Sequence, residues 1–461
     1  MYYYIMYIMG KIRRRYMNQI PENKDEYLKS RRASTAEGMA AMTITTLIGG
    51  TYLSGFLNDN GVSTTLNGLI SAIPTIAGLI QPIGAVFALK RAKRKPIVTV
   101  GAITHRSLSS LMFFLPLFIK NPGMRIAAIV VMFALANATS AFISPASANW
   151  LASLTPQRVR GKYYSLREMY CLVTISVITL ITGGILDYFK SKGNVTHGFY
   201  VIGGMCIAAA IINFISLSVM MEPESERISS KGESFIKTAK AVFTETSFRP
   251  VLLVCMLYNF GVHVMLPYWG IYLVGEMELS YSFISIISLA AIVVKALSVR
   301  RWGRYADKTS WTVVTKLSIG IIAVSHLASV FVVPSTKYVL YPLTTTISNF
   351  GWAAIGISIQ NLQFDYAPAQ GRTMYIGVCA ALTGVAGFIG ALVGGLMLGA
   401  VTRLKPTIFG VQIRGQQVLM LASGILLLLC VLYIKKVLEK NKKIINKSDG
   451  SRIKPSTQNG N

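Results

Sequence analysis

The sequence predicts an all-α integral membrane protein with twelve transmembrane helices in two pseudo-symmetric six-helix bundles. Three observations lead to this prediction. Hydrophobic residues make up 52% of the 461 residues and charged residues only 14%, whereas a soluble domain carries about 25% charged residues because its surface faces water. Twelve apolar runs are long enough to cross a bilayer, and the last six repeat features of the first six.

Each of the twelve apolar runs has about the length of a membrane-spanning helix. A bilayer core takes roughly 20 apolar residues per helix, and no run shows the strict alternation that a transmembrane barrel strand requires. We therefore predict helices near residues 35–57, 65–88, 97–118, 126–151, 164–186, 198–221, 250–274, 279–299, 312–333, 338–361, 375–401 and 417–434.

The predicted helices divide the chain into five segments. The polar middle segment ends in an amphipathic stretch, which favours a tether between two halves or a short helix on the inner membrane surface. The five segments are a cytoplasmic N-terminal segment (1–33), an N-terminal six-helix half (34–221), a cytoplasmic linker (222–248), a C-terminal six-helix half (249–437) and a basic cytoplasmic tail (438–461).

The formal net charge of +28 is spread over many loops. Loops on one side, such as 90–95 and 157–162, are rich in Lys and Arg, and those on the other side are poorer in them. Because Lys and Arg favour the cytoplasmic side of a membrane, we expect a multi-pass protein of the plasma membrane with both termini in the cytoplasm. The spread of the charge, without a nucleic-acid-binding motif, argues against a nucleic-acid partner.

The two halves share an internal repeat, which indicates duplication of a six-helix unit. At a constant separation of 212 residues the matched pairs are Asn137 and Asn349, Ala141 and Ala353, Ile143 and Ile355, Asn149 and Asn361, Pro156 and Pro368, Arg160 and Arg372, Tyr163 and Tyr375, and Gly183 and Gly395. They surround the loops after the fourth and tenth predicted helices. A looser match relates Gly84–Ala88 to Gly303–Asp307, after the second and eighth helices.

With twelve spans, a six-plus-six repeat, a cytoplasmic linker and the element Gly303-x-x-x-Asp307-Lys308, the chain resembles the major facilitator superfamily of transporters over about residues 34–437. The resemblance implies that this element lies between paired helices on the cytoplasmic side. Its carboxylate, Asp307, would cap a neighbouring helix and pair with an arginine, latching the outward-facing state. Arg372, on the loop entering the eleventh helix, is one candidate for this partner, and Arg160 is its counterpart in the first half.

The resemblance also implies a central solute cavity near mid-membrane, between the halves. Polar and aromatic side chains at helix centres are the candidates, because a polar group facing lipid would lack a partner. Asn259 and His263 are four residues apart and share one helix face. The candidate substrate-binding residues are Asn137, Asn349, Trp352, Tyr258, Asn259, His263, Trp269 and Tyr52. The alternative is that the asparagines join helices through interhelical hydrogen bonds.

Several ionisable residues lie within or near the spans: Glu37, His105, Arg106, Arg167, Glu168, Lys295 and His326. Most lie close to a membrane face, where snorkelling or structural pairing explains them. Arg106 lies deeper and needs a carboxylate or an anion as partner. No acid occurs at mid-membrane, so Glu37 and Glu168 are the candidate acids for coupling to a proton, and a sodium ion is the alternative.

Amides beside aromatic rings suit an uncharged, hydroxyl-rich solute such as a sugar. We therefore expect a monomeric secondary transporter of a small solute that works by alternating access in the lipid bilayer. The alternative within this class is an exporter of amphiphilic drugs or metabolites. Drug antiporters of the superfamily usually carry a Gly-Pro pair late in the fifth span, and Thr174–Gly184 contains no proline.

Other classes of function find little support in the sequence. A non-transporting membrane sensor stays open as an alternative. A lipid-processing enzyme would need clustered acids or a metal site at a membrane face, and an ATP-driven pump would need a phosphate-binding loop; neither pattern occurs. The five cysteines are an odd number without paired metal-ligand spacing. We expect no enzyme activity, no metal site and no cofactor.

Overall fold

The computed structural model describes residues 27–89, 93–155, 157–223, 244–368, 372–404, 406–408 and 411–439. Most of the expected N-terminal segment, linker and tail therefore lies outside the described residues. The described chain is almost entirely helical. The exception is a short hairpin of two antiparallel strands with two residues each, β1 (Thr407–Ile408) and β2 (Val411–Gln412), in which Thr407 pairs with Gln412.

The first bundle contains six helical spans. Its first span is α2 (Leu28–Leu47) and α3 (Gly50–Asp59), which meet at a bend of 44°. The second is built from α4 (Thr64–Ser71), α5 (Ile73–Ala77), η2 (Gly78–Ile80) and α6 (Gln81–Leu89), and the third from α7 (Lys95–Leu111), η3 (Met112–Phe114) and α8 (Leu115–Phe118). The last three are α9 (Pro122–Ser153), α10 (Gln157–Ser191) and α11 (Val195–Val219).

The second bundle repeats this arrangement. Its first span is α13 (Arg249–His263), α14 (Leu266–Ile271) and the π-helical turn η4 (Tyr272–Glu276). Pro267 lies in the first turn of α14, where its missing N–H breaks no intrahelical hydrogen bond. The others are α15 (Tyr281–Lys308), α16 (Trp311–Ser329), α17 (Lys337–Tyr366), α18 (Arg372–Leu404), and α19 (Gly415–Tyr433) with η5 (Ile434–Leu438).

Length and composition agree with a membrane-spanning role. Ten helical segments of the described chain are long and apolar enough to cross a bilayer, and the bent pair α2–α3 adds an eleventh. The remaining helix, α17, has 30 residues and is therefore about 45 Å long at roughly 1.5 Å per residue, although its Thr, Ser and Asn side chains make it more polar. The predicted fold of twelve helices in two bundles is confirmed.

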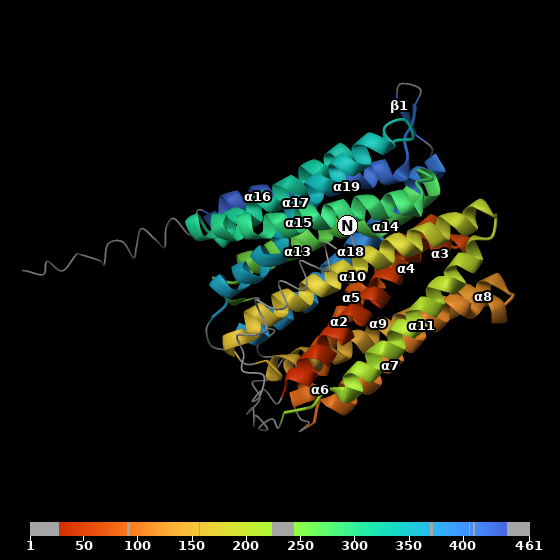
Figure 1. The fold of residues 1–461 in the computed structure, drawn as a ribbon. Coiled ribbons are helices and arrows are strands. Elements are labelled where there is room, and N and C mark those ends of the chain that lie inside the picture. Colours follow the sequence, from red (N-terminus) through yellow and green to blue (C-terminus); the bar gives the residue numbers. More distant parts are fainter. Residues whose placement is uncertain are drawn as a thin grey trace, which may run out of the picture.

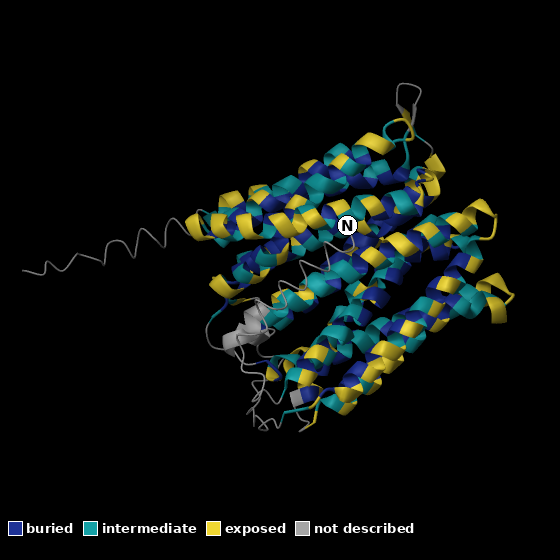
Figure 2. Cartoon of the chain, viewed as in Figure 1, coloured by how far each residue is buried: buried dark blue, intermediate teal, exposed yellow. Residues whose placement is uncertain are grey.

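Large apolar side chains cover the outer faces of the helices. Ile83, Val100, Phe118 and Leu396 are each more than 60% exposed, and Figure 2 shows exposed residues along the outward sides of both bundles. Contiguous exposed apolar surface of this extent is unusual in a soluble monomer. Lipid is the solvent that suits these faces.

The two bundles meet mainly at one end of the molecule. There α14 packs against α3 and α4, α18 against α4 and α5, and α10 against α15. This end carries the loops at 60–63 and 192–194, and the start of the described chain at residue 27 lies at the other end. Figure 1 shows the bundles converging near α3, α4 and α14 and diverging away from them.

Glycine permits the closest approach between the bundles. A Cβ at Gly68 of α4 would lie 1.9 Å from the ring of Tyr268 of α14, which is far inside van der Waals contact. The Tyr268 hydroxyl donates to the carbonyl of Ala391 at 2.6 Å. A ring from the second bundle is therefore packed directly against the backbone of the first at a glycine.

Candidate functional site

A cavity of about 310 Å³, lined by both polar and apolar side chains, lies beneath the contact between the bundles, largely within the second one. It is walled by α14, η4, α15, α16 and α17, and by the start of α3 from the first bundle. Its lining residues are Gly50, Thr51, Met265, Leu266, Trp269, Leu273, Ile284, Ser288, Ser325, His326, Ser329, Tyr341, Thr344, Thr345, Ser348, Asn349 and Trp352. We call this the first cavity.

A second cavity, of about 320 Å³, lies between α2–α3, α10 and α15. Its lining residues are Thr45, Thr46, Gly49, Gly50, Thr51, Tyr52, Ile175, Thr179, Ile284, Ser285, Ser288 and Ile292. Four residues, Gly50, Thr51, Ile284 and Ser288, line both cavities. The two spaces therefore adjoin at the bend between α2 and α3.

Four hydroxyl groups in the first cavity can serve a ligand only as acceptors. The hydroxyls of Ser288 and Ser329 each donate to a carbonyl one turn earlier in their own helix, and those of Ser325 and Thr344 donate to the carbonyls of Thr344 and Leu340. Because each hydroxyl carries one hydrogen, these four oxygens keep only lone pairs for a ligand.

His326 is an acceptor towards the first cavity as well. The Ser423 hydroxyl donates to the Gly261 carbonyl at 2.6 Å, so it must accept from Nδ1 of His326, which lies 2.9 Å away. This assigns the hydrogen of the neutral ring to Nδ1 and leaves a lone pair on Nε2. His326 lines the first cavity and its Nδ1 is bonded to Ser423 of α19, so Nε2 is the ring nitrogen that remains for a ligand.

Aromatic rings stiffen the walls of the first cavity. Trp269 stacks on Tyr272 with ring centroids 5.5 Å apart, and Trp352 meets Tyr258 edge-on at 6.1 Å. Such pairs have preferred geometries, so the two indole rings are held in place. No Asp, Glu, Lys or Arg is among the lining residues.

The predicted substrate-binding residues separate into two groups. Asn349, Trp352 and Trp269 line the first cavity and Tyr52 lines the second. Asn137, Tyr258, Asn259 and His263 line neither, although Tyr258 supports Trp352 from behind. The four residues that line a cavity come from α3, α14 and α17.

The paired asparagines have the same local hydrogen bond but different surroundings. Asn137 donates from Nδ2 to the Phe133 carbonyl at 2.8 Å, and Asn349 does so to the Thr345 carbonyl at 2.9 Å. Asn259 bonds to the carbonyl of Cys255 in the same way, and Nδ1 of His263 bonds to the carbonyl of Asn259 at 2.8 Å. These contacts lie within single helices and leave the second amide hydrogen and the amide oxygen of each asparagine available.

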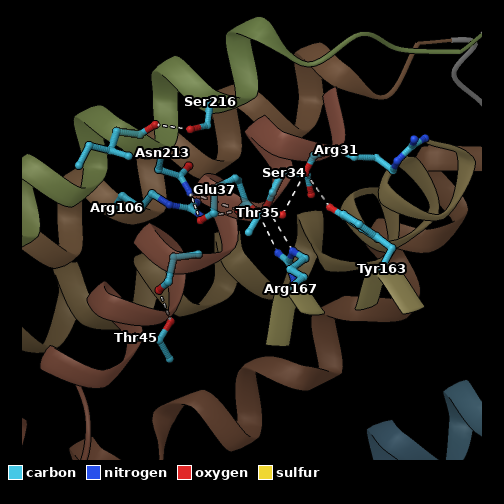
Figure 3. A network of polar contacts seen from close by, with 12 residues as sticks. Arg31, Ser34, Thr35, Glu37, Thr45, Arg106, Tyr163, Arg167, Asn213 and Ser216 are labelled. Atoms are coloured by element: carbon cyan, nitrogen blue, oxygen red, sulfur yellow. Dashed lines mark hydrogen bonds and ion pairs between the residues drawn. The ribbon is translucent and has the colours of Figure 1, made fainter. Parts of the chain in front are cut away.

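A charged network holds four helices of the first bundle together (Figure 3). Glu37 of α2 accepts from Arg106 of α7 at 3.2 Å and from Arg167 of α10 at 3.0 Å. Asn213 of α11 donates to the same carboxylate at 3.2 Å. The carboxylate that Arg106 needs is thus Glu37, and two arginines share it. Gly38 makes room, since a Cβ there would lie 2.4 Å from the Arg167 guanidinium.

A second polar contact joins the two bundles where they meet. Both carboxylate oxygens of Asp187, near the end of α10, accept backbone N–H groups at the start of α15, from Tyr281 at 2.8 Å and Ser282 at 2.7 Å. A carboxylate at a helix N-terminus is stabilised by the free N–H groups and by the helix dipole. We call this contact the Asp187 clasp.

The Tyr52 hydroxyl lies close to the Asp187 clasp. It donates to the Thr179 carbonyl at 2.9 Å and accepts from the Thr182 hydroxyl at 2.9 Å, with the Ser285 hydroxyl at 3.2 Å. Its ring stacks on Tyr281 at 6.2 Å. Tyr52 therefore joins the bundles, and only part of its surface is left for a solute.

The predicted latch element is only partly described. Gly303 has open space beside its Cα, and Asp307 and Lys308 are exposed at the end of α15. Among the residues that the structure describes, Asp307 forms no ion pair. The side chains of Arg160 and Arg372 lie outside the described residues.

Sequence reasoning missed much of the first cavity. Thr51, Ser288, Ser325 and Thr344 were not predicted, and His326 was noted only as an ionisable residue. The available signal was a polar stripe, because Ser325 and Ser329, like Thr344 and Ser348, are four apart and share a face of an otherwise apolar helix. No group of three or more metal-ligating side chains occurs within the described parts of the chain.

We compared the chain with known protein families, curated sequences and solved structures. A family model described as the Major Facilitator Superfamily matches residues 36–391. None of the curated protein sequences matches the chain significantly.

Among solved structures, the fold resembles a bacterial homologue of the iron transporter ferroportin in an inward-facing state, with a TM-score of 0.67 and 14% identity over 89% of this chain and 98% of that one. The nucleoside transporter NupG gives 0.63 and 13% over 89% and 98%. The xylose transporter XylE from E. coli, inward open, gives 0.61 and 15% over 88% and 95%. At these identities the likeness shows a shared fold.

Proposed function

Because the chain belongs to the Major Facilitator Superfamily, we propose that it is a secondary transporter that carries a small, uncharged, hydroxyl-rich solute, such as a sugar, by alternating access. The observation that carries this proposal is the first cavity beneath the contact of the bundles, which combines hydroxyl and amide side chains with two indole rings and has no charged side chain in its lining. Transporter sites of this kind lie near mid-membrane at the junction of repeats.

The composition of the first cavity favours an uncharged solute. A charged solute that enters a membrane interior needs a counter-charge, and the lining offers none. Asn349 and the indole N–H groups can donate hydrogen bonds to a solute. His326 and the hydroxyls that already donate to protein carbonyls can accept them. The hydroxyl groups of a solute can both donate and accept hydrogen bonds, so a polyol matches the lining of the first cavity best.

Two of the three structural relatives support this class of solute. Two of them are transporters of nucleosides and of xylose, and both kinds of solute carry several hydroxyl groups. The third is related to an iron transporter, whose cargo would need charged or metal-ligating side chains. The lining of the first cavity offers one imidazole, His326, and no carboxylate or thiol group.

We further propose that the structure is the inward-facing state in a plasma membrane. The positive loops suggest that the end bearing both termini faces the cytoplasm. The bundles then meet on the outer side, through the Asp187 clasp and α14, and diverge towards the cytoplasm.

The coupling ion is proposed to be a proton or sodium bound away from Glu37. Protonating Glu37 would leave the guanidinium groups of Arg106 and Arg167 without their shared counter-charge, which is costly for buried ions. We therefore assign Glu37 a structural role. Glu168 is the remaining candidate acid from the sequence, and the transporter is expected to act as a monomer.

The test is binding to the purified chain in detergent, measured as thermal stabilisation by D-xylose, D-glucose, uridine and the cation tetraphenylphosphonium. A ligand at a hundredfold excess over its dissociation constant stabilises by roughly 2.7 kcal/mol. We expect a sugar or nucleoside to stabilise the wild type. Asn349→Ala should weaken that binding about tenfold, the upper end for one lost hydrogen bond.

Asn137→Ala is the matched control, because Asn137 has the same local hydrogen bond but lines neither cavity. It should bind like the wild type. Stabilisation by tetraphenylphosphonium alone, unaffected by either substitution, would favour the exporter of amphiphiles and contradict the proposal. Uptake of the bound solute into proteoliposomes would then separate a transporter from a sensor that only binds.

A further inference from the structure

The first span of the chain is broken inside the membrane. Helix α2 ends at Leu47 and α3 begins at Gly50, where φ is +53° and the axis bends by 44°. Only glycine adopts this backbone conformation without strain. About 14 Å of helix follow the break, at roughly 1.5 Å per residue, so the break lies well within the apolar run that begins near residue 35.

The break leaves backbone donors without partners. The first hydrogen bond of α3 runs from Leu53 to the Gly49 carbonyl, and no side chain caps the helix. Within the described chain, the amides of Gly50, Thr51 and Tyr52 donate no hydrogen bond. Three consecutive N–H groups at the positive end of a helix dipole are therefore free.

Free backbone groups are costly in a membrane. An unsatisfied amide in an apolar environment costs several kcal/mol, and irregular backbone at membrane depth is tolerated where it lines a cavity. Gly50 and Thr51 are among the few residues that line both cavities. The break thus lies at the junction of two cavities, where a ligand can satisfy its donors.

An acceptor that lacks a partner lies in the same space. His326 is only 4% exposed, its Nδ1 is bonded to Ser423, and its Nε2 has no hydrogen-bonding partner in the described parts of the chain. His326 and Thr51 come from different bundles and line the same first cavity. A ligand held between them must accept on one side and donate on the other.

We propose that the free amides at the start of α3 bind the solute directly, and that the solute is an uncharged polyol whose hydroxyls accept from α3 and donate to His326. This inference deepens the proposed function and rests on it. A helix N-terminus also suits an anion. The lone pairs of His326, Ser325 and Thr344 would repel one, so the site favours the hydroxyl compound over its carboxylate analogue.

Proline substitution removes one amide hydrogen with little other damage. Thr51 is the second residue of α3, and proline is tolerated in the first turn of a helix because the N–H there has no intrahelical partner. Thr51→Ala removes the same side chain but keeps the amide. We expect Thr51→Pro to bind D-xylose or uridine, whichever binds the wild type, roughly threefold to tenfold more weakly than Thr51→Ala, as for one lost hydrogen bond.

Straining the backbone at the break is the second test. It keeps the inference testable if the proline variant does not fold. Gly50→Ala strains a residue at φ +53°, and Gly193→Ala strains one at φ +72° in the loop after α10; neither new Cβ has a neighbour within 4 Å. Both should lower thermal stability without ligand to a similar extent. Only Gly50→Ala should reduce ligand-induced stabilisation.

The outcomes separate the two proposals. If the wild type binds a probe, and Thr51→Pro and Gly50→Ala bind it as well as their controls do, the α3 amides are not ligands and this inference is wrong while the proposed function stands. Stronger stabilisation by D-xylonate than by D-xylose would replace the polyol with an anion and overturn the inference. If the wild type binds no probe, the proposed function fails and this inference fails with it.

Discussion

Substituting Glu37 by glutamine should strongly destabilise the first bundle. The side chain keeps its shape, but Arg106 and Arg167 lose their shared counter-charge. The side chains of Glu37, Arg106 and Arg167 are 15%, 9% and 19% exposed, so the arginines cannot simply turn to water. Breaking a buried ion pair by removing one partner costs about 3–5 kcal/mol, and the partial exposure of Arg167 places the expected loss near ~3 kcal/mol.

The assay is the thermal midpoint of the detergent-purified protein, followed by size-exclusion chromatography after heating. If the first bundle unfolds as one unit, ~3 kcal/mol corresponds to a fall of about 6–12 °C, at roughly 2–4 °C per kcal/mol. Glu439→Gln is the matched control, because it breaks the more exposed Lys316–Glu439 pair and should cost at most about 1 kcal/mol.

A double-mutant cycle identifies the cause. Adding Arg106→Met to Glu37→Gln removes one of the two stranded charges, so the double variant should be more stable than the sum of the single losses predicts. If Glu37→Gln shifts the midpoint no more than Glu439→Gln does, the network is not a major source of stability. In that case our reason for excluding Glu37 as the coupling acid fails as well.

Two further substitutions should change the balance between the inward- and outward-facing states. Asp187→Asn weakens two charge-assisted hydrogen bonds of the Asp187 clasp, each worth about 1.5–3 kcal/mol. It should therefore raise the reactivity of a cysteine placed on the outer side. The control is Asp59→Asn, which should not raise it, because the Asp59 carboxylate bonds to Thr196 within the first bundle. Gly384→Ala would place a Cβ 2.7 Å from the Thr75 carbonyl across the bundles, whereas Gly377→Ala on the same helix meets nothing within 4 Å. We expect only Gly384→Ala to increase outer-side cysteine labelling, and equal labelling of the two variants would show that this contact does not limit opening.

Much of the fold could be predicted because the membrane imposes simple rules on the sequence. Each span needs about 20 apolar residues and must satisfy its own backbone hydrogen bonds, so the runs of apolar residues revealed the helices. The repeat that relates Asn137 to Asn349 revealed that the helices form two similar bundles. These properties depend on composition and local spacing, which one sequence contains.

The site could be predicted only in part, because helical spacing shows which residues share a face but not what that face meets. Asn137 and Asn349 are equivalent in the repeat and make equivalent local bonds, yet only Asn349 lines the first cavity. The difference arises from how α9 and α17 pack in their bundles. The helix break at Gly50 becomes a candidate binding site only because two cavities lie beside it.

The sequence by itself determined the membrane class, the spans and the repeat. The tertiary structure decided the partners of the buried charges: Glu37 lies 69 residues before Arg106 and 130 before Arg167, and Asp187 lies 94 residues before the α15 amide that it caps. A buried charge takes as its partner whichever opposite charge or free N–H group the packing brings within about 3 Å. That proximity is a property of the packed bundles, and no local pattern in the chain encodes it.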